Sequence, residues 1–276
     1  MVQSPWAAPL APALNDSRID GEEFALDQTS PLPAAAGLER PMAAPIPIDA
    51  ERLADVALLA ALPRAVREEA AALARARPLP RGLRVFDQGE RAGRAHALLS
   101  GCVRITQSGS DGEEILVRFI GPGEIFGCVP VLTDGLYPAD ATTMVDSLEL
   151  SWDPADLLAL MERHSQVAIN MVAIVGKRLG EAQERLRELA TQSAERRVAR
   201  TLLRLLDQAG RRTDDGVRID FPLRRKDIAN IAGTTLHTAS RFIAGWERQG
   251  LLATRHHHII IGSPDELRVL AEESPG

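Results

Sequence analysis

The stretch TTLHTASRF, residues 234–242, combines short hydroxyl side chains with one histidine and one arginine. Its apolar residues recur at helical spacing, which predicts an α-helix. His237, Ser240 and Arg241 are three and four residues apart and therefore share one face of that helix. An arginine can pair with O6 and N7 of guanine, and serine or histidine can reach other base edges or phosphates. This face is predicted to bind DNA.

The start of the same helix favours a contact with phosphate. Thr234 and Thr235 can cap the helix, whose first backbone N–H groups can bind an anion. Thr238 in this helix and Arg225 and Lys226 upstream complete the predicted DNA-binding set. The alternative is an ordinary surface helix, in which the arginine pairs with a carboxylate and the histidine is only solvated.

The residues around this helix match the packing pattern of a helix-turn-helix. The pattern needs a small residue where two helices cross, a glycine where the turn takes a positive φ, and apolar residues in the shared core. Counted from residue 225, the fourth, fifth, ninth, fifteenth and eighteenth positions are Ile228, Ala229, Gly233, Ala239 and Phe242. The following segment, LLATRHHHIIIG, predicts a β-hairpin that could act as a wing.

The charge of the chain is distributed unevenly. The whole chain has a formal charge of −6, but residues 196–255 contain thirteen Lys or Arg against six Asp or Glu. This segment is therefore about +7 and the rest of the chain is strongly acidic. A basic segment around the predicted helix suits a nucleic-acid partner, although solvated helix faces would produce the same asymmetry.

The chain has two cysteines, Cys102 and Cys128. Two thiols cannot supply a four-cysteine metal or iron–sulfur site, and nothing indicates a secreted disulfide framework. The sequence has no apolar run of 18 residues and no compact signal peptide. We expect a reducing, cytoplasmic setting.

The composition and hydrophobic pattern of the first half of the chain change twice along the sequence. Residues 1–47 hold eight of the eighteen prolines and are predicted to be a disordered Pro/Ala-rich tail. Residues 49–77 carry two short helical patterns broken at Pro63. Residues 81–153 alternate short β-branched runs with glycines, which predicts an antiparallel sandwich or small barrel.

A long helix is predicted after this β-region. Apolar residues recur at alternating spacings of four and three for three heptads: Ala168, Val172, Val175, Leu179, Ala182, Leu186 and Leu189. Such a seam favours a symmetric two-helix contact, although it could pack on its own domain. Val167, Met171 and Ile174 lie on a neighbouring face and are predicted to cover the β-domain of the same subunit. Downstream, residues 194–210 predict an amphipathic helix and VRIDFPL a short strand pair.

Two segments carry a family resemblance. KDIANIAGTTLHTASRFIAGWERQGLL resembles the C-terminal helix-turn-helix of the Crp/Fnr family of bacterial transcription regulators, and DGEEILVRFIGPGEIFG resembles its cyclic-nucleotide-type β-roll. The resemblance covers roughly residues 50–270. It implies an α+β fold with a jelly-roll-like β-roll, a long dimerisation helix and a winged helix-turn-helix. It also implies a homodimer bound to a palindromic operator in double-stranded DNA, with RNA polymerase as a partner of an activator.

The resemblance divides the chain into four expected parts. They are a tail over 1–47, a sensory β-roll domain with flanking helices over 49–163, a dimerisation helix over 164–192 and a DNA-binding domain over 193–276. The recognition helix near 235–248 keeps the last two residues of the Fnr-like pattern Glu-x-x-Ser-Arg, Ser240 and Arg241, but has His237 at the first. We therefore expect a palindrome related to the Fnr-type site, with an altered base where the glutamate reads.

The resemblance also bears on which effector, if any, the β-roll senses. The expected effector pocket comprises Gly123, Glu124, Ile125, Phe126, Gly127, Cys128, Tyr137 and Met171. The cyclic-nucleotide branch places a glutamate after the second glycine and an Arg-Ser pair about ten residues later. Here Cys128 follows Gly127 and YPADATT has no arginine, so a cyclic phosphate would lack its charge-assisted bonds. The iron–sulfur branch needs an N-terminal cysteine cluster that this chain lacks.

The sequence also leaves alternative sensing chemistries and alternative protein classes to be considered. His96 and His164 could ligate haem, and the two cysteines could form a thiol switch, although structural roles are commoner for such residues. The segment RHHH at 255–258 could bind a metal, although contact with phosphate or plain exposure to solvent is commoner in a wing hairpin. A cupin-like metal enzyme needs more histidines than the one, His96, in the β-region. We expect no enzyme and no bound metal; a ligand-binding module without DNA binding is the remaining rival.

Overall fold

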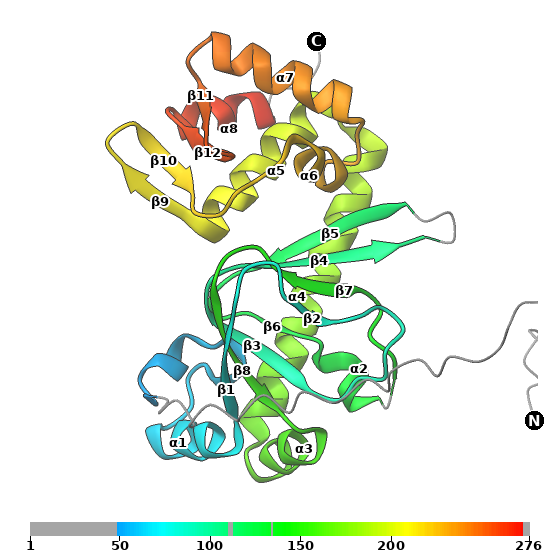
Figure 1. Cartoon of the computed structure of the whole chain (residues 1–276), viewed down its shortest axis with the longest axis vertical. Helices are drawn as coiled ribbons and strands as arrows, with labels where there is room; N and C mark the ends of the chain where they lie inside the picture. Colours follow the sequence, from blue (N-terminus) through cyan, green and yellow to red (C-terminus); the bar gives the residue numbers. More distant parts are fainter. Residues whose placement is uncertain (1–48, 110–112, 134, 273–276) are drawn as a thin grey trace, which may run out of the picture. The chain divides into compact units, whose positions relative to one another are not determined.

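The computed structural model describes residues 49–109, 113–133 and 135–272. The predicted tail over residues 1–47 lies outside the described residues. The rest of the chain alternates strands and helices in the predicted order, with the β-region first, one long helix next and a mixed C-terminal region last (Figure 1). The fold is therefore α+β, as predicted.

The β-region is a sandwich of two antiparallel sheets of four strands each. The first sheet has the order β1 (Arg75–Leu79), β8 (Ser147–Trp152), β3 (Ala95–Ser100), β6 (Ile125–Phe126). The second has the order β2 (Arg84–Phe86), β7 (Asp140–Thr143), β4 (Val103–Ser108), β5 (Glu114–Ile120). This architecture confirms the prediction of an antiparallel sandwich.

The alternation of side chains along β3 separates two cores. Ala95 and Ala97 belong to an apolar cluster with Leu157 and Leu160 of α3 (Pro154–Arg163). Leu98 points to the other face and packs in a cluster with residues of the second sheet and Tyr137. Successive residues of a strand face opposite sides of the sheet, so one strand contributes to both cores.

The segment before the sandwich differs from its prediction. The first helical pattern forms two 3₁₀ turns, η1 (Arg52–Asp55) and η2 (Ala57–Leu59), and the second forms α1 (Arg64–Leu73). Residues 75–79 form β1 at the edge of the first sheet, paired with β8, although residues 75–77 were predicted as the end of a helical pattern. Pro78 lacks an N–H group and is tolerated in an edge strand.

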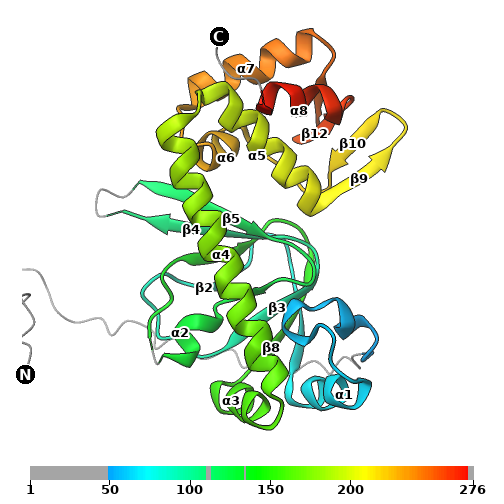
Figure 2. The same cartoon turned by 180° about the vertical axis from the view of Figure 1, so that it is seen from behind.

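The long helix is α4 (Ser165–Thr191), which Figure 2 shows lying along the β-sandwich. Val167 and Met171 are buried and Ile174 packs on the same apolar cluster, as predicted. The seam faces solvent instead, and its exposed fractions include 71% for Val172, 58% for Leu179 and 67% for Leu186. Most of the seam is therefore not covered by the described part of its own subunit, although Leu189 at its C-terminal end lies against Gly233.

The C-terminal region combines helices with a four-stranded sheet of order β11-β12-β10-β9. Its elements are α5 (Ala194–Ala209), β9 (Gly210–Thr213), β10 (Gly216–Ile219), α6 (Arg225–Ile231), α7 (Leu236–Arg248), β11 (Leu252–Arg255), β12 (His258–Ile261) and α8 (Pro264–Glu272). The strand pair predicted within VRIDFPL was wrong in position. The partner of β10 is the polar β9 that precedes it, whereas Phe221 and Leu223 are buried beyond the strand.

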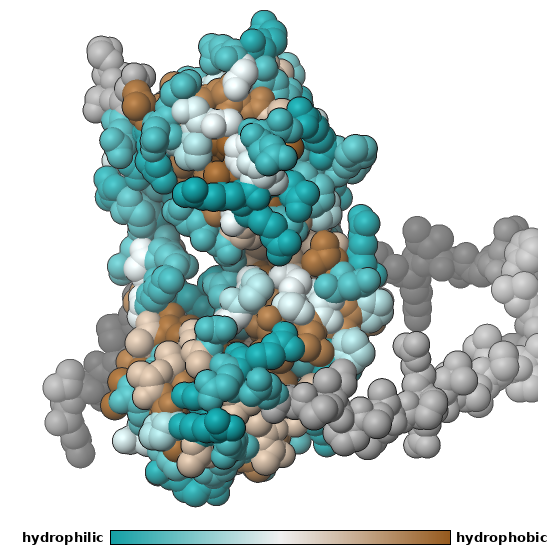
Figure 3. All heavy atoms as spheres, turned by 90° about the vertical axis from the view of Figure 1, so that its left-hand side faces the viewer, coloured by the Kyte–Doolittle hydropathy of each residue, from teal (hydrophilic) through white to brown (hydrophobic). Residues whose placement is uncertain are grey.

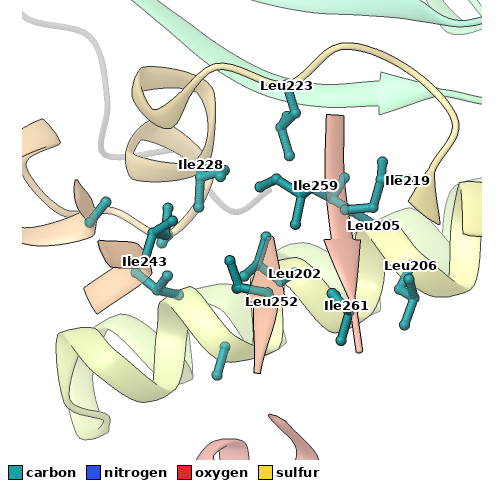
Figure 4. Packing of buried hydrophobic residues seen from close by; sticks show 14 of the residues in the cluster. Leu202, Leu205, Leu206, Ile219, Leu223, Ile228, Ile243, Leu252, Ile259 and Ile261 are labelled. Atoms are coloured by element: carbon teal, nitrogen blue, oxygen red, sulfur yellow. The ribbon is translucent and has the colours of Figure 1, made fainter. Parts of the chain in front are cut away.

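The core of this region forms where α5 meets the sheet and the two-helix unit. Figure 4 shows Leu202 and Leu205 of α5 beside Ile259 of β12, with Ile228 and Ile243 contributed by α6 and α7. Hydrophilic side chains cover most of the surface drawn in Figure 3, with hydrophobic side chains in smaller patches. Within the described residues, no helix is long and apolar enough to cross a membrane.

Candidate nucleic-acid interface

Helices α6 and α7 form the predicted helix-turn-helix. Gly233 has φ +59° in the turn between them, a conformation that favours glycine. The backbone N–H of Thr234 donates to the carbonyl oxygen of Ala229 at 2.9 Å. Ala229 and Ala239 are 1% and 0% exposed, so both are buried in the apolar core that the two helices share.

The recognition helix α7 begins with a hydroxyl cap. Thr235 is the N-cap residue, and its Oγ1 accepts a hydrogen bond from the N–H of Thr238 at 3.1 Å. The Thr235 hydroxyl also donates to Oγ1 of Thr238 at 2.9 Å. One threonine therefore satisfies a free N–H group of the first turn and orients the hydroxyl of the other.

Replacing Thr235 with alanine is expected to lower the free energy of unfolding by about 0.5–2 kcal/mol, because the cap bond is lost. Chemical denaturation of the full chain measures this difference. Thr235→Ser keeps the hydroxyl and should stay within a few tenths of a kcal/mol of the parent. Equal losses for the alanine and serine variants would show that the cap bond contributes nothing.

The face of α7 predicted to bind DNA is exposed. His237 and Arg241 are exposed and Ser240 is half-buried, whereas Ala239, Ile243 and Trp246 on the opposite side are buried. The guanidinium carbon of Arg241 lies 5.1 Å from the centroid of the Phe242 ring, within the range of a cation–π contact. In the described part of the chain, Arg241 has no carboxylate partner and therefore keeps its guanidinium available.

The basic residues at the start of α6 are not equivalent. Arg225 Nη2 lies 2.9 Å from Glu247 Oε2 of α7, so this predicted DNA-binding residue already forms an ion pair. Lys226 is exposed and has no ion-pair partner among the described residues. The Arg224 side chain and backbone both donate to the buried carboxylate of Asp227. The sequence analysis did not identify Glu247 and Asp227 as partners of these arginines, because nothing in their spacing distinguishes them from other acidic residues.

The predicted effector residues lie in three different environments. Gly127, at φ +63°, lies so close to Phe86, His96 and Tyr137 that an added Cβ would stand 3.0–3.2 Å from their rings. The Phe86 and Tyr137 rings stack with centroids 3.8 Å apart. Tyr137 donates through its hydroxyl to the carbonyl oxygen of Arg94 at 2.7 Å. Aromatic side chains therefore fill the interior of the sandwich next to Gly127.

Three other effector residues face the helices. Ile125, Cys128 and Met171 pack in the cluster with α3 and α4. The half-buried guanidinium of Arg178, on α4, donates to the carbonyl oxygen of Ile125. Burial and the neighbouring Arg118 lower the pKa of Arg178 from its ordinary value. The sequence analysis did not identify this cation, because an arginine on a long helix is usually solvated.

Glu124 has a third environment. Its carboxylate accepts hydrogen bonds from Arg118 Nη2 at 2.6 Å, the N–H of Gly121 at 2.7 Å and Gln208 Nε2 of α5 at 2.6 Å. Gly123, at φ +82°, donates its N–H to the carbonyl oxygen of Leu98 at 2.7 Å. The carboxylate of Glu124 and the N–H of Gly123 are therefore already engaged in hydrogen bonds within the protein.

A cleft of about 270 Å³ adjoins the same aromatic rings, because Phe86, His96 and Tyr137 are among its lining residues. Of the predicted effector residues only Tyr137 lines it. The lining residues are Arg75, Arg77, Val85, Phe86, Glu90, Gly93, Arg94, His96, Tyr137, Glu149 and Ser151. Its guanidinium groups are largely paired, since Arg77 binds Glu149 at 2.8 Å and Arg94 binds Asp153 at 2.7 Å.

The histidines considered as haem or metal ligands have separate partners. His96 Nδ1 lies 3.1 Å from Glu149 Oε2 inside the sandwich, and His164 Nε2 lies 2.7 Å from Glu69 Oε2. His258 Nδ1 lies 3.0 Å from the carbonyl oxygen of Ile219. No group of three or more metal-ligating side chains is found within residues 49–109, 113–133 and 135–272.

The two cysteines are buried, with exposed fractions of 2% each. Burial raises the pKa of the Cys102 thiol well above its ordinary value, and nearby Glu124 adds to the rise. Burial also raises the pKa of the Cys128 thiol, although Arg178 opposes the rise. Both groups therefore stay protonated near neutral pH, and a thiol is a poor nucleophile compared with a thiolate.

Both thiols are expected to react with a disulfide reagent at least about tenfold more slowly in the folded chain than in denaturant, because burial restricts access and disfavours the thiolate. Absorbance of the released aromatic thiol at pH 8 measures both rates. Cys128→Ser and Cys102→Ser, measured separately, assign the remaining reactivity to one site. Rapid labelling of either cysteine in the folded chain would instead support a thiol switch.

Comparison with known proteins places these features in a family. A model of the cyclic nucleotide-binding domain matches residues 76–164, and a model of the Crp-like helix-turn-helix domain matches residues 196–270. The cyclic AMP receptor protein of Thermus thermophilus is 34% identical over 173 residues, 63% of this chain and 77% of that protein. A CRP-like cAMP-activated global transcriptional regulator of Mycobacterium tuberculosis is 26% identical over 188 residues, 68% of this chain and 84% of that protein.

The fold agrees with this relationship. The structure of FixK2 from Bradyrhizobium japonicum is similar with a TM-score of 0.63 at 24% identity, and the match covers 73% of this chain and 99% of that one. The resemblance stated from the sequence is confirmed, and so is the expectation that the protein is not an enzyme. With its cyclic nucleotide-binding-type sandwich, long helix and Crp-like helix-turn-helix, the chain belongs to the Crp/Fnr family of DNA-binding transcription regulators.

Proposed function

We propose that this regulator acts in the cytoplasm as a homodimer that binds a palindromic operator, with one recognition helix α7 in each half-site. The observation that carries the proposal is the exposed face of α7, where His237 and Arg241 lack internal ion pairs in the described part of the chain. The N-terminal half of a recognition helix lies in the major groove of DNA. Arg241 then contacts a guanine, while Ser240 and His237 contact neighbouring bases or phosphates.

The dimer part of the proposal rests on α4. Its seam is apolar over three heptads, from Ala168 to Leu189, and every seam residue after the half-buried Ala168 is exposed. A second copy of the same helix would bury both seams by knobs-into-holes packing. The two recognition helices of such a dimer would then read half-sites about one DNA turn, roughly 34 Å, apart.

The operator should differ from an Fnr-type palindrome at one base pair of each half-site. A glutamate can only accept hydrogen bonds from a base, whereas an imidazole can donate. His237 stands where the Fnr-like pattern has that glutamate. The altered base is therefore one that presents an acceptor, such as N7 of a purine, at the corresponding position.

We further propose that DNA binding does not require cyclic AMP or an iron–sulfur cluster. The names of two relatives refer to cyclic AMP, but residues 127–133 and 135–143 contain no basic side chain. Aromatic rings fill the space beside Gly127, and Arg178 donates to a backbone carbonyl instead of standing free. A small-ligand sensor is the second candidate, because the cleft lined by Tyr137 and His96 could admit an effector.

Selection of bound sequences from random double-stranded DNA, with purified full chain and no added ligand, tests the proposal. The expected result is a palindrome containing a guanine, from a colourless protein, with affinity that falls steeply with salt through counterion release. Cyclic AMP at millimolar concentration should leave the affinity unchanged. Enrichment only with cyclic AMP would overturn ligand independence. Failure to bind DNA at low salt would support a module without DNA binding, and a Soret band would identify haem as the missing group.

A further inference from the structure

One guanidinium binds the C-terminal ends of two helices. Arg197, in the first turn of α5, donates from all three of its side-chain nitrogens to backbone carbonyl oxygens. The acceptors are Gln192 at 2.7 Å, Ala232 at 2.8 Å and Gly233 at 3.0 Å. Gln192 is the C-cap residue of α4 and Ala232 is the C-cap residue of α6. The turn between α6 and α7 therefore lies beside the joint between α4 and α5 (Figure 2).

An arginine suits this position for two physical reasons. The last carbonyl groups of a helix have no partner within the helix, and the C-terminal end of a helix carries a partial negative charge. A guanidinium also presents its N–H groups in a rigid planar fork, so it can bond to several oxygens at once. A lysine would bring the same charge but only one compact ammonium group.

The end of α4 also packs on the turn that Arg197 holds. Gly233 has φ +59°, and a Cβ added to it would overlap a methyl group of Leu189. Gln192 is extended between α4 and α5, and its side-chain oxygen is buried without a hydrogen-bond partner among the described residues. Arg197 and Leu189 therefore hold the joint and the turn together, without help from that oxygen.

Other bonds of α5 act further along the helix. Arg204 donates to the buried carboxylate of Glu188 on α4 at 2.8 Å. Gln208, near the end of α5, donates to Glu124 of the sandwich at 2.6 Å. These bonds fix α5 on α4 and on the sandwich, but they do not involve the turn between α6 and α7. Arg197 joins that turn to the end of α4.

We propose that Arg197 is a positioning residue that sets the half-site spacing accepted by the dimer; this inference rests on the proposed operator binding by α7. In that dimer the two copies of α4 pair, so the angle between α4 and the two-helix unit determines how far apart the recognition helices lie. Arg197 keeps this angle fixed by holding the turn before α7 at the end of α4. The guanidinium acts without contacting DNA, because its three nitrogens are already bonded.

The test compares the affinity of the full chain for its selected operator with the affinity for operators whose spacer has one base pair more or less. One base pair shifts the half-sites by about 3.4 Å and rotates them by about 34°. The parent chain should lose at least about tenfold for either change, because binding both half-sites together raises the affinity by about 10²–10⁴. In Arg197→Ala the same changes should cost less than about threefold, since a loosened joint lets both helices reach their half-sites.

Two further variants separate the bonds of Arg197 from its charge and from general effects on α5. Arg197→Lys keeps the charge but not the fork, so it should relax the spacing preference as the alanine variant does. Arg196→Ala is the matched control, because the neighbouring Arg196 donates to the carbonyl oxygens of Ala271 and Glu272 on α8, outside the two-helix unit. It should keep the spacing preference of the parent. Melting curves by circular dichroism show which variants are folded in the binding assay, and Arg197→Lys carries the test if the alanine variant is not.

Each outcome supports or overturns the inference. Relaxation in Arg197→Ala alone would assign the positioning to the charge at the two helix ends and still support the role of Arg197. Unchanged spacing penalties in the folded Arg197 variants, or a parent chain indifferent to spacing, overturn the inference and leave operator binding in place. Equal relaxation in Arg196→Ala would show a general loosening of α5 and also overturns it. Failure to select any operator at low salt removes the proposed function and this inference together.

Discussion

Replacing Leu179 with glutamate is expected to convert the dimer into a monomer and to weaken operator binding by at least about 100-fold. Leu179 lies in the middle of the seam of α4 and is 58% exposed within its subunit. In a paired seam the substitution would bury two carboxylates facing each other without partners, which is strongly unfavourable. A monomer also loses the gain, about 10²–10⁴ in affinity, that comes from linking two half-site contacts.

Light scattering after size-exclusion chromatography measures the mass of the variant, and fluorescence anisotropy measures its affinity for the operator. The Leu179 side chain is exposed in the subunit. The variant should therefore keep the circular dichroism spectrum of the parent chain, which shows that the subunit still folds. Leu158→Glu on α3 is the matched control, because Leu158 is 44% exposed but lies outside the seam. A dimeric Leu179→Glu variant would contradict the assignment of the seam.

Replacing Arg241 with alanine is expected to weaken operator binding by about 30-fold to 10⁴-fold. A paired contact between an arginine and a guanine contributes about 1–3 kcal/mol of discrimination. A two-fold symmetric complex contains the contact twice, so about 2–6 kcal/mol is lost, at about 1.4 kcal/mol for each tenfold change. The guanidinium is exposed and is not held by a carboxylate in the described part of the chain, so its removal leaves no buried charge behind.

The specificity of the same variant provides a second readout. Binding to operators with each base in turn at the guanine position should become nearly equal for Arg241→Ala, while preferences elsewhere persist. Arg268→Ala on α8 removes an equal charge outside the helix-turn-helix, where Arg268 pairs with Asp265. This control should change the affinity by less than about threefold, since surface ion pairs contribute little. A retained guanine preference in Arg241→Ala would transfer the reading of that base to another side chain.

Much of the fold could be predicted from local patterns. The heptad spacing from Ala168 to Leu189 predicted α4, and the glycine-marked strands predicted the sandwich. The small residues at 229, 233 and 239 predicted the two-helix unit and its turn. These elements could be predicted because the pattern that defines each one is formed by residues that are close together in the sequence.

Elements that depend on distant partners were mispredicted. Arg75–Leu79 forms a strand because it pairs with Ser147–Trp152, more than 65 residues away, although its first three residues were assigned to a helical pattern. The polar strand Gly210–Thr213 is likewise defined by its pairing with Gly216–Ile219 and by no apolar alternation of its own. Strand formation depends strongly on the partner, which a single sequence does not display.

The sequence by itself determined that this chain has a helix-turn-helix with an arginine on its recognition helix, in a basic segment that follows an apolar seam. Only the tertiary structure decided which of the basic residues are free. Arg225 and Arg241 are both arginines of the two-helix unit, yet Glu247 holds the first across the helix pair and nothing described holds the second. The structure alone also joined Arg197 to the turn between α6 and α7. The physical reason is common to both: ion pairs and bonds from side chains to the backbone form between residues that are distant in sequence, so periodicity cannot reveal them.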